Sequence, residues 1–163
     1  PLMQYIGKSG YAIWKCPADK STVPVGTQKL PRVRSNSMSQ VFDFGGWLPS
    51  PPYRVYGKAA QIVSPVRTFV LLDEHPDSIN DAAFAVQMAD PGATSARIID
   101  FPASFHGGAC GFSFADGHSE IHKWKGSTIK ARVAYTGTMP LNVDAGDSVK
   151  DVIWMSSVAT VLK

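Results

Sequence analysis

Four residues near the middle of the chain have side chains suited to chemistry: His106, Asp116, His118 and Glu120. Imidazole and carboxylate groups bind metal ions and transfer protons. His118 and Glu120 lie two residues apart, so on an extended strand they would point to the same side and could share an ion. The four residues are therefore candidate catalytic residues of a metal-dependent hydrolase, for which a small ester or lactone is the substrate class.

His118 and His122 are separated by three residues, a spacing that on a helix would suit two ligands of one zinc ion. On an extended strand the two residues are about 13 Å apart, too far for two imidazoles to reach one ion. The sequence therefore favours a polar hairpin face at these histidines over a zinc site.

Acidic residues also cluster near the C-terminus, where Asp144, Asp147 and Asp151 surround Gly146. A glycine-containing loop rich in aspartate can supply the oxygen ligands that calcium prefers. The alternative is a solvated loop in which Asp147 or Asp151 caps a final helix. A second acidic group follows an apolar run and is better explained as a strand end and a helix cap; it comprises Asp73, Glu74, Asp77, Asn80 and Asp81.

The element that must position His118 and Glu120 is a hairpin. Asp116 and Gly117 stand between two alternating runs and predict a two-residue type I′ turn. That turn would pair Ser113 with Glu120, and Phe112 with Ile121. One face, predicted to enter the core, would carry Phe112, Phe114 and Ile121. The opposite face, predicted to stay open, would carry His118, Glu120, His122 and Trp124.

The remaining segments predict an α+β fold with an antiparallel sheet. Residues 66–72 read as a buried strand, and residues 11–14 as another. Residues 82–89 suggest a short helix capped by Asp81 or else a strand, and residues 128–135 a helix or a strand. Residues 21–58 hold five of the twelve prolines, which predicts a long irregular excursion.

Composition narrows the class of protein. The chain has 163 residues, 44% of them hydrophobic, and a net charge of +3, as expected for one globular domain spanning residues 1–163. No apolar run approaches the ~20 residues of a membrane span. Lysine and arginine are scattered among proline and glycine, so we expect no nucleic-acid partner.

The two cysteines, Cys16 and Cys110, lack the C-x-x-C spacing of common zinc and redox motifs. In an exported protein they could form a disulfide, whereas in the cytosol both would be reduced. The sequence leaves both alternatives open.

Several blocks together resemble the soluble domains of bacterial pseudopilin-like proteins, which have a prepilin-type N-terminus and a His, nine-residue, Asp-Gly motif. The motif is formed here by His106, Asp116 and Gly117. The other blocks, in chain order, are residues 11–19 (YAIWKCPAD), 34–38 (RSNSM), 69–74 (FVLLDE), 78–81 (SIND) and 151–155 (DVIWM).

The resemblance implies a pilin-like head domain whose long hydrophobic N-terminal helix is truncated here to residues 2–6. It implies a structural subunit of a type II secretion or type IV pilus-like system, exported and anchored in the inner membrane. The subunit would contact other pseudopilin subunits through the missing helix. It also implies calcium in the C-terminal loop, residues 142–151, and favours pairing of Cys16 with Cys110.

Overall fold

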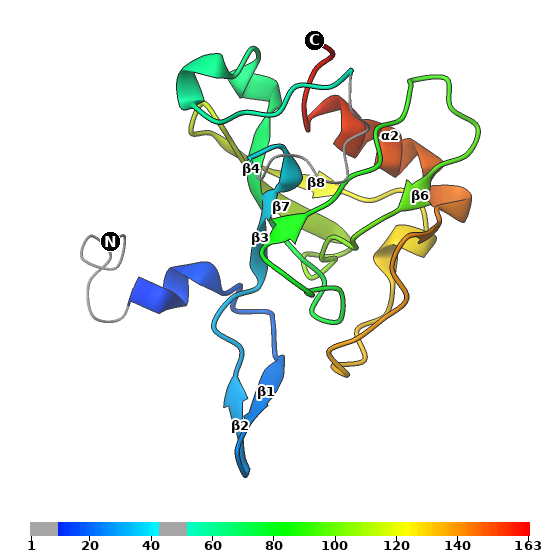
Figure 1. Cartoon of the computed structure of the whole chain (residues 1–163). Coiled ribbons are helices and arrows are strands. Elements are labelled where there is room, and N and C mark those ends of the chain that lie inside the picture. The colour runs from blue at the N-terminus through cyan, green and yellow to red at the C-terminus, as the bar shows by residue number, and fades with distance from the viewer. Residues whose placement is uncertain (1–9, 43–51) are drawn as a thin grey trace.

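A five-stranded sheet forms the centre of the molecule in the computed structural model, which describes residues 10–42 and 52–163 (Figure 1). Its strand order is β5-β3-β4-β7-β8. The strands are β3 (Asn36–Ser39), β4 (Phe69–Asp73), β5 (Ala83–Phe84), β7 (Ala109–Phe114) and β8 (Ser119–Lys123). Neighbours are antiparallel except β3 and β5, which are parallel. The predicted α+β class with an antiparallel sheet is confirmed.

Two smaller sheets and one α-helix complete the described part. Strands β1 (Thr22–Val25) and β2 (Gln28–Pro31) form a hairpin arm that projects from the body, as Figure 1 shows. Strands β6 (Arg97–Ile98) and β9 (Val143–Asp144) pair with each other, and the helix is α2 (Val149–Ser157). The 3-10 helices are η1 (Gly10–Trp14), η2 (Gln40–Phe42), η3 (Ala59–Gln61), η4 (Pro65–Arg67), η5 (Thr128–Lys130) and η6 (Gly146–Ser148).

The chain reverses between β7 and β8 where Asp116 and Gly117 predict, but the loop has three residues instead of two. The N–H of Phe114 donates to the carbonyl of His118, and the N–H of Gly117 donates back to Phe114. Gly117 takes a left-handed φ of 96°, as in a type I turn followed by a bulge. The register is therefore shifted by one residue: Phe112 faces Glu120, and Gly111 faces Ile121.

This shift overturns the predicted faces of the hairpin, because a one-residue slip moves a whole strand's side chains to the other side. Ile121, expected in the core, is 69% exposed. Trp124, expected on an open face, is only 2% exposed and packs at 6.0 Å between ring centroids from Phe112. His122 of β8 thus lies on the same side of the sheet as the core aromatics, where it stacks on Trp154.

The core lies between this side of the sheet and α2. The ring of Phe112 makes edge-to-face contacts with Phe69 of β4 and with Trp154 of α2. Trp154 also stacks on His122 at a centroid distance of 3.4 Å. Further buried residues of the same cluster include Phe84, Leu72, Ile98, Ile129, Val152 and Met155.

Other local predictions meet mixed outcomes. The strand predicted at residues 66–72 is confirmed as β4, which begins later because η4 precedes it. Residues 11–14 form a 3-10 helix, so the predicted strand is wrong there. Residues 21–58 include strands β1, β2 and β3, so this excursion is less irregular than its prolines suggest. Residues 83–84 form strand β5, so the strand alternative holds over the helix, and only a 3-10 turn forms within residues 128–135.

The predicted remnant of an N-terminal helix, residues 2–6, lies outside the described residues. Among those that are described, no helix has the length and apolar character needed to cross a bilayer.

Candidate functional site

Three side chains from distant parts of the sequence meet at one point of the structure: Cys16, Asp73 and His106. The Sγ atom of Cys16 lies 3.6 Å from Nε2 of His106, and the same nitrogen lies 3.5 Å from Oδ2 of Asp73. All three atoms lie within 4.8 Å of one another. In the part of the chain that the structure describes, this is the one such group of three or more metal-binding side chains.

Cys16 follows η1 and begins a tight turn with Pro17, Ala18 and Asp19. The N–H of Asp19 donates to the carbonyl of Cys16 over 3.0 Å. The Cys16 N–H donates to the hydroxyl of Ser35, which ties the turn to the start of β3. Burial raises the pKa of the Cys16 thiol, the neighbouring backbone of Ala18 and Asp19 lowers it, and the negative charge of Asp73 raises it further.

His106 lies in the loop that leads into β7, and glycines shape that loop. Gly107 and Gly108 both have left-handed φ values, 65° and 83°, which side chains larger than hydrogen rarely tolerate. The carbonyl of Gly108 accepts a hydrogen bond from the N–H of Trp124, so the loop is fixed to the end of β8. The imidazole of His106 itself remains partly exposed.

Asp73 is the last residue of β4, next to Gly111 of β7. A Cβ at position 111 would lie 3.2 Å from Oδ2 of Asp73, so a glycine leaves the carboxylate its space. Burial raises the pKa of the Asp73 carboxyl, and the neighbouring His106 and the N–H of Gly111 lower it.

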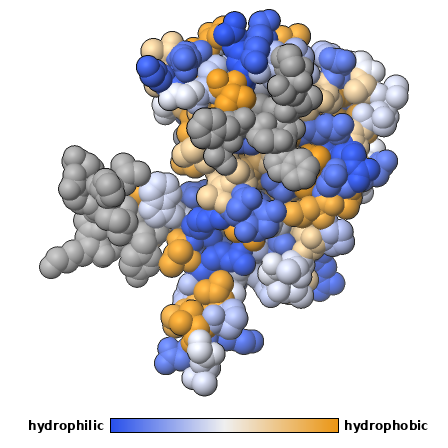
Figure 2. Space-filling view, in the orientation of Figure 1, coloured by the Kyte–Doolittle hydropathy of each residue, from blue (hydrophilic) through white to orange (hydrophobic). Residues whose placement is uncertain are grey.

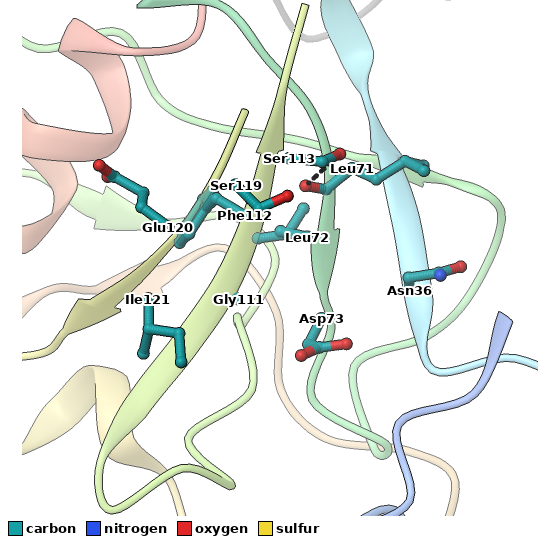
Figure 3. A pocket seen from close by; sticks show the side chains of 10 residues that line it. All are labelled: Asn36, Leu71, Leu72, Asp73, Gly111, Phe112, Ser113, Ser119, Glu120 and Ile121. Carbon is teal, nitrogen blue, oxygen red and sulfur yellow. Dashed lines mark hydrogen bonds between the residues drawn. The ribbon is translucent and has the colours of Figure 1, made fainter. Parts of the chain in front are cut away.

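Asp73 also borders a cavity of about 410 Å³ on the side of the sheet away from the core. Figure 3 shows Asp73 at one end of this cavity, with Ser113 and Leu71 at the other and Ile121 at its margin. The carboxylate is therefore reachable from solvent along the open side of the sheet.

The second cysteine lies beside the same group without joining it. The thiol of Cys110 is buried and donates to the carbonyl of Asp73 over 3.1 Å. Burial raises the pKa of Cys110, so this thiol stays protonated. Both cysteines are unpaired in the structure, and the disulfide implied by the resemblance stays a prediction.

The four residues predicted to form a catalytic site are not brought together. Asp116 and His118 form a pair at the hairpin loop, with 2.6 Å between Oδ1 and Nδ1, and His118 stacks on Phe114. His106 lies at the opposite end of β7, whose six residues span about 20 Å. Glu120 is exposed on β8.

The three carboxylates predicted to bind calcium at the C-terminal loop accept hydrogen bonds from backbone N–H groups. The two oxygens of Asp151 accept the N–H groups of Lys125 and Gly126, and those of Asp147 accept the N–H groups of Ser127 and Thr128. Asp144 accepts only the N–H of Gly146. An ion at this loop would have to displace these donors, and calcium there stays a prediction.

The other acidic group, from Asp73 to Asp81, is likewise dispersed. Glu74 is fully buried and accepts hydroxyl hydrogen bonds from Ser37 and Ser78. Asp77 accepts the N–H groups of residues 134, 135 and 137 and so shapes that turn. Asp81 accepts the N–H of Ala83 at the start of β5.

Sequence reasoning singled out His106 but missed its partners. The sequence suggests a disulfide for Cys16 and a strand end for Asp73, and neither role places these residues beside His106. No short-range spacing links three residues that are brought together by sheet pairing. No family model, curated protein or solved structure matches the chain.

Proposed function

We propose that this chain is the head domain of a pseudopilin-like structural subunit in a type II secretion or type IV pilus-like system. The proposal starts from the resemblance of six sequence blocks. The observation that carries it is that these blocks, spread along the chain, contact one another in the folded molecule.

The first contacts join the N-terminal blocks to the sheet. The Cys16 N–H donates to the hydroxyl of Ser35, and the carbonyl of Ser35 accepts the N–H of Glu74 over 2.7 Å. Arg34 donates to the carbonyl of Asp81. Four of the six blocks are connected in this way.

The two remaining blocks complete the unit. His106, which opens the His, nine-residue, Asp-Gly motif, lies against Cys16 and Asp73. Trp154, from the last block, packs on Phe112, which lies within the motif. Residues with this pattern of mutual contact are expected to be retained together because each depends on the others for its position.

The course of the chain is also compatible with a helix ahead of the head. Helix η1 lies at the margin of the molecule, beside the β1–β2 arm and away from α2 (Figure 1). A preceding segment could therefore leave the head without crossing its core. The proposed subunit is exported, anchored in the inner membrane through that segment, and assembled with other pseudopilin subunits.

Calcium belongs to the proposal only through the resemblance, as an ion held by Asp144, Asp147 and Asp151. Melting the protein with added calcium and with EDTA tests it. A rise in melting temperature that is lost in D147N supports the ion, and identical melts contradict it.

The proposal is tested by reading the coding sequence ahead of Pro1 and by examining the cell surface. We expect codons for a hydrophobic segment of about 20 residues, the length of a membrane span. We also expect antibodies against the head to detect it in fibres sheared from cells. A coding sequence without that segment, together with sheared fractions that lack the protein, would overturn the proposal.

The alternative, a metal-dependent hydrolase of a small ester or lactone, has less support. His106 lies at the opposite end of β7 from the Asp116–His118 pair, so the four residues do not meet at one substrate atom. Assays of model esters and lactones are expected to give no turnover. Turnover that is lost in H118Q would favour the hydrolase instead.

A further inference from the structure

Two polar atoms compete for one nitrogen of His106. One nitrogen, Nε2, faces both the sulfur of Cys16 and the carboxylate of Asp73. A protonated nitrogen has one hydrogen, which can point well at only one of them. An unprotonated nitrogen would instead turn its lone pair toward the lone pairs of the carboxylate.

The same geometry argues against a cysteine nucleophile activated by a triad. In a triad the nucleophile and the orienting carboxylate contact different nitrogens of the imidazole, so that a proton can pass through the ring. Here the thiol and the carboxylate share a single nitrogen. A cation can bind three such groups at once, and their ligand atoms lie within 4.8 Å of one another.

The distances fit zinc. With Zn–S near 2.3 Å and Zn–N or Zn–O near 2.0–2.2 Å, neighbouring ligands of a tetrahedral site lie about 3.4–3.6 Å apart. The observed separations are 3.6 Å from Cys16 to His106 and 3.5 Å from His106 to Asp73. We propose that Cys16, Asp73 and His106 bind a Zn²⁺ ion, with water as the fourth ligand.

The surroundings of the ligands fit the same ion. The backbone of Cys16 is held on both sides, because its N–H donates to the Ser35 hydroxyl and its carbonyl accepts the N–H of Asp19, so the sulfur is fixed in place beside the other two ligands. The Asp73 carboxylate lies against Gly111, whose missing side chain leaves it space. A thiolate and an imidazole select zinc over calcium or magnesium, which prefer oxygen ligands.

The ion would act as a clip between three segments. Cys16 belongs to the N-terminal turn, Asp73 ends β4, and His106 precedes β7. Binding releases the thiol proton of Cys16 to solvent and fixes the N-terminal turn to the sheet. This inference goes beyond the proposed fibre function and does not depend on it.

The test measures zinc binding by the purified protein with a reductant present. After removal of metals with EDTA, dialysis against zinc chloride and elemental analysis are expected to give one zinc per chain. C16S, D73N and H106Q are each expected to weaken binding at least tenfold, whereas H118Q, which alters a histidine outside the site, should bind as the wild type does. Unchanged binding in C16S or H106Q, or loss in H118Q, would overturn the proposal.

A second measurement on the wild-type chain removes any dependence on how the variants fold. Zinc should slow alkylation of Cys16 by iodoacetamide at least tenfold, as followed by mass spectrometry, with buried Cys110 as the internal reference. Cobalt in place of zinc should give a thiolate-to-metal charge-transfer band. Equal alkylation rates with and without zinc, and no such band, would contradict the site.

Discussion

Glu74 is a buried carboxyl group whose hydrogen-bond partners are hydroxyl groups of Ser37 and Ser78. Burial raises its pKa from 4.5 to about 8. The pKa of Glu74 is higher in the folded protein than in the unfolded chain, so the folded protein is favoured while Glu74 is neutral. This contribution to the free energy of unfolding is fully present below pH 4.5 and is lost as the pH rises through about 8.

We therefore predict that E74Q gains stability relative to the wild type between pH 5 and pH 9. Glutamine stays neutral and keeps the same shape, so it avoids the ionisation cost, which is at most roughly 5 kcal/mol for a shift of this size. Urea unfolding at both pH values measures the difference. A stability difference that does not change with pH would contradict the buried, neutral state of Glu74.

Asp151 is a second buried carboxylate, and it binds two backbone N–H groups, those of Lys125 and Gly126. We predict that D151N is less stable by about 1–3 kcal/mol, because an amide has one acceptor oxygen and leaves one buried N–H unpaired. The matched control is D144N, since Asp144 uses a single oxygen that asparagine retains. Equal unfolding free energies for the two variants would show that the Asp151 contacts do not hold this loop.

At the scale of elements, the hairpin β7–β8 shows how far local sequence signals reach. Asp116 and Gly117 mark the reversal correctly, because Gly117 is needed at a left-handed φ. They do not distinguish a two-residue loop from a three-residue loop with a bulge, since both use Asp-Gly. That single residue decides which side of the sheet each side chain of β8 occupies.

Gly117 provides a direct test of the loop. We predict that G117A destabilises the protein by about 1–2 kcal/mol, because alanine is strained at a φ of 96°. Gly92 is an exposed glycine without left-handed φ and with open space around its Cβ position, so G92A should change stability little. Thermal melts of both variants make the comparison. Similar losses in the two would contradict the left-handed residue at the loop.

The register itself is tested by two isoleucines. Ile121 is 69% exposed, whereas Ile129 is fully buried. We predict that I121A costs less than about 1 kcal/mol and I129A about 2–5 kcal/mol, because only the latter leaves a cavity. Chemical unfolding measures both. A loss for I121A as large as that for I129A would restore the two-residue turn and the register that goes with it.

At the scale of the whole molecule, the candidate site depends on contacts between residues far apart in sequence. The chemistry of His106 could be recognised from its residue type and its place before the hairpin. Its partners could not, because Cys16 reaches it through the turn bonded to Ser35, and Asp73 through the pairing of β4 with β7. Sequence patterns report local periodicity, whereas this site arises from the order of strands in the sheet.

The same contacts join the sequence blocks into one unit, which includes the N-terminal turn. Helix η1 and the β1–β2 arm project from the sheet, and Figure 2 shows hydrophobic surface on that arm. Exposed apolar residues of the arm include Val25 and Leu30, and Val33 follows just after β2. A zinc clip at Cys16 would fix this arm relative to the sheet.

The meeting of Cys16, Asp73 and His106 is thus a contact that holds the N-terminal turn on the sheet, beside the hydrogen bond of Cys16 to Ser35. X-ray absorption at the zinc edge of the loaded wild-type protein tests it most directly. We predict one sulfur ligand at about 2.3 Å and nitrogen or oxygen ligands at about 2.0–2.2 Å, four in all. A zinc shell of nitrogen and oxygen alone, without sulfur, would contradict it.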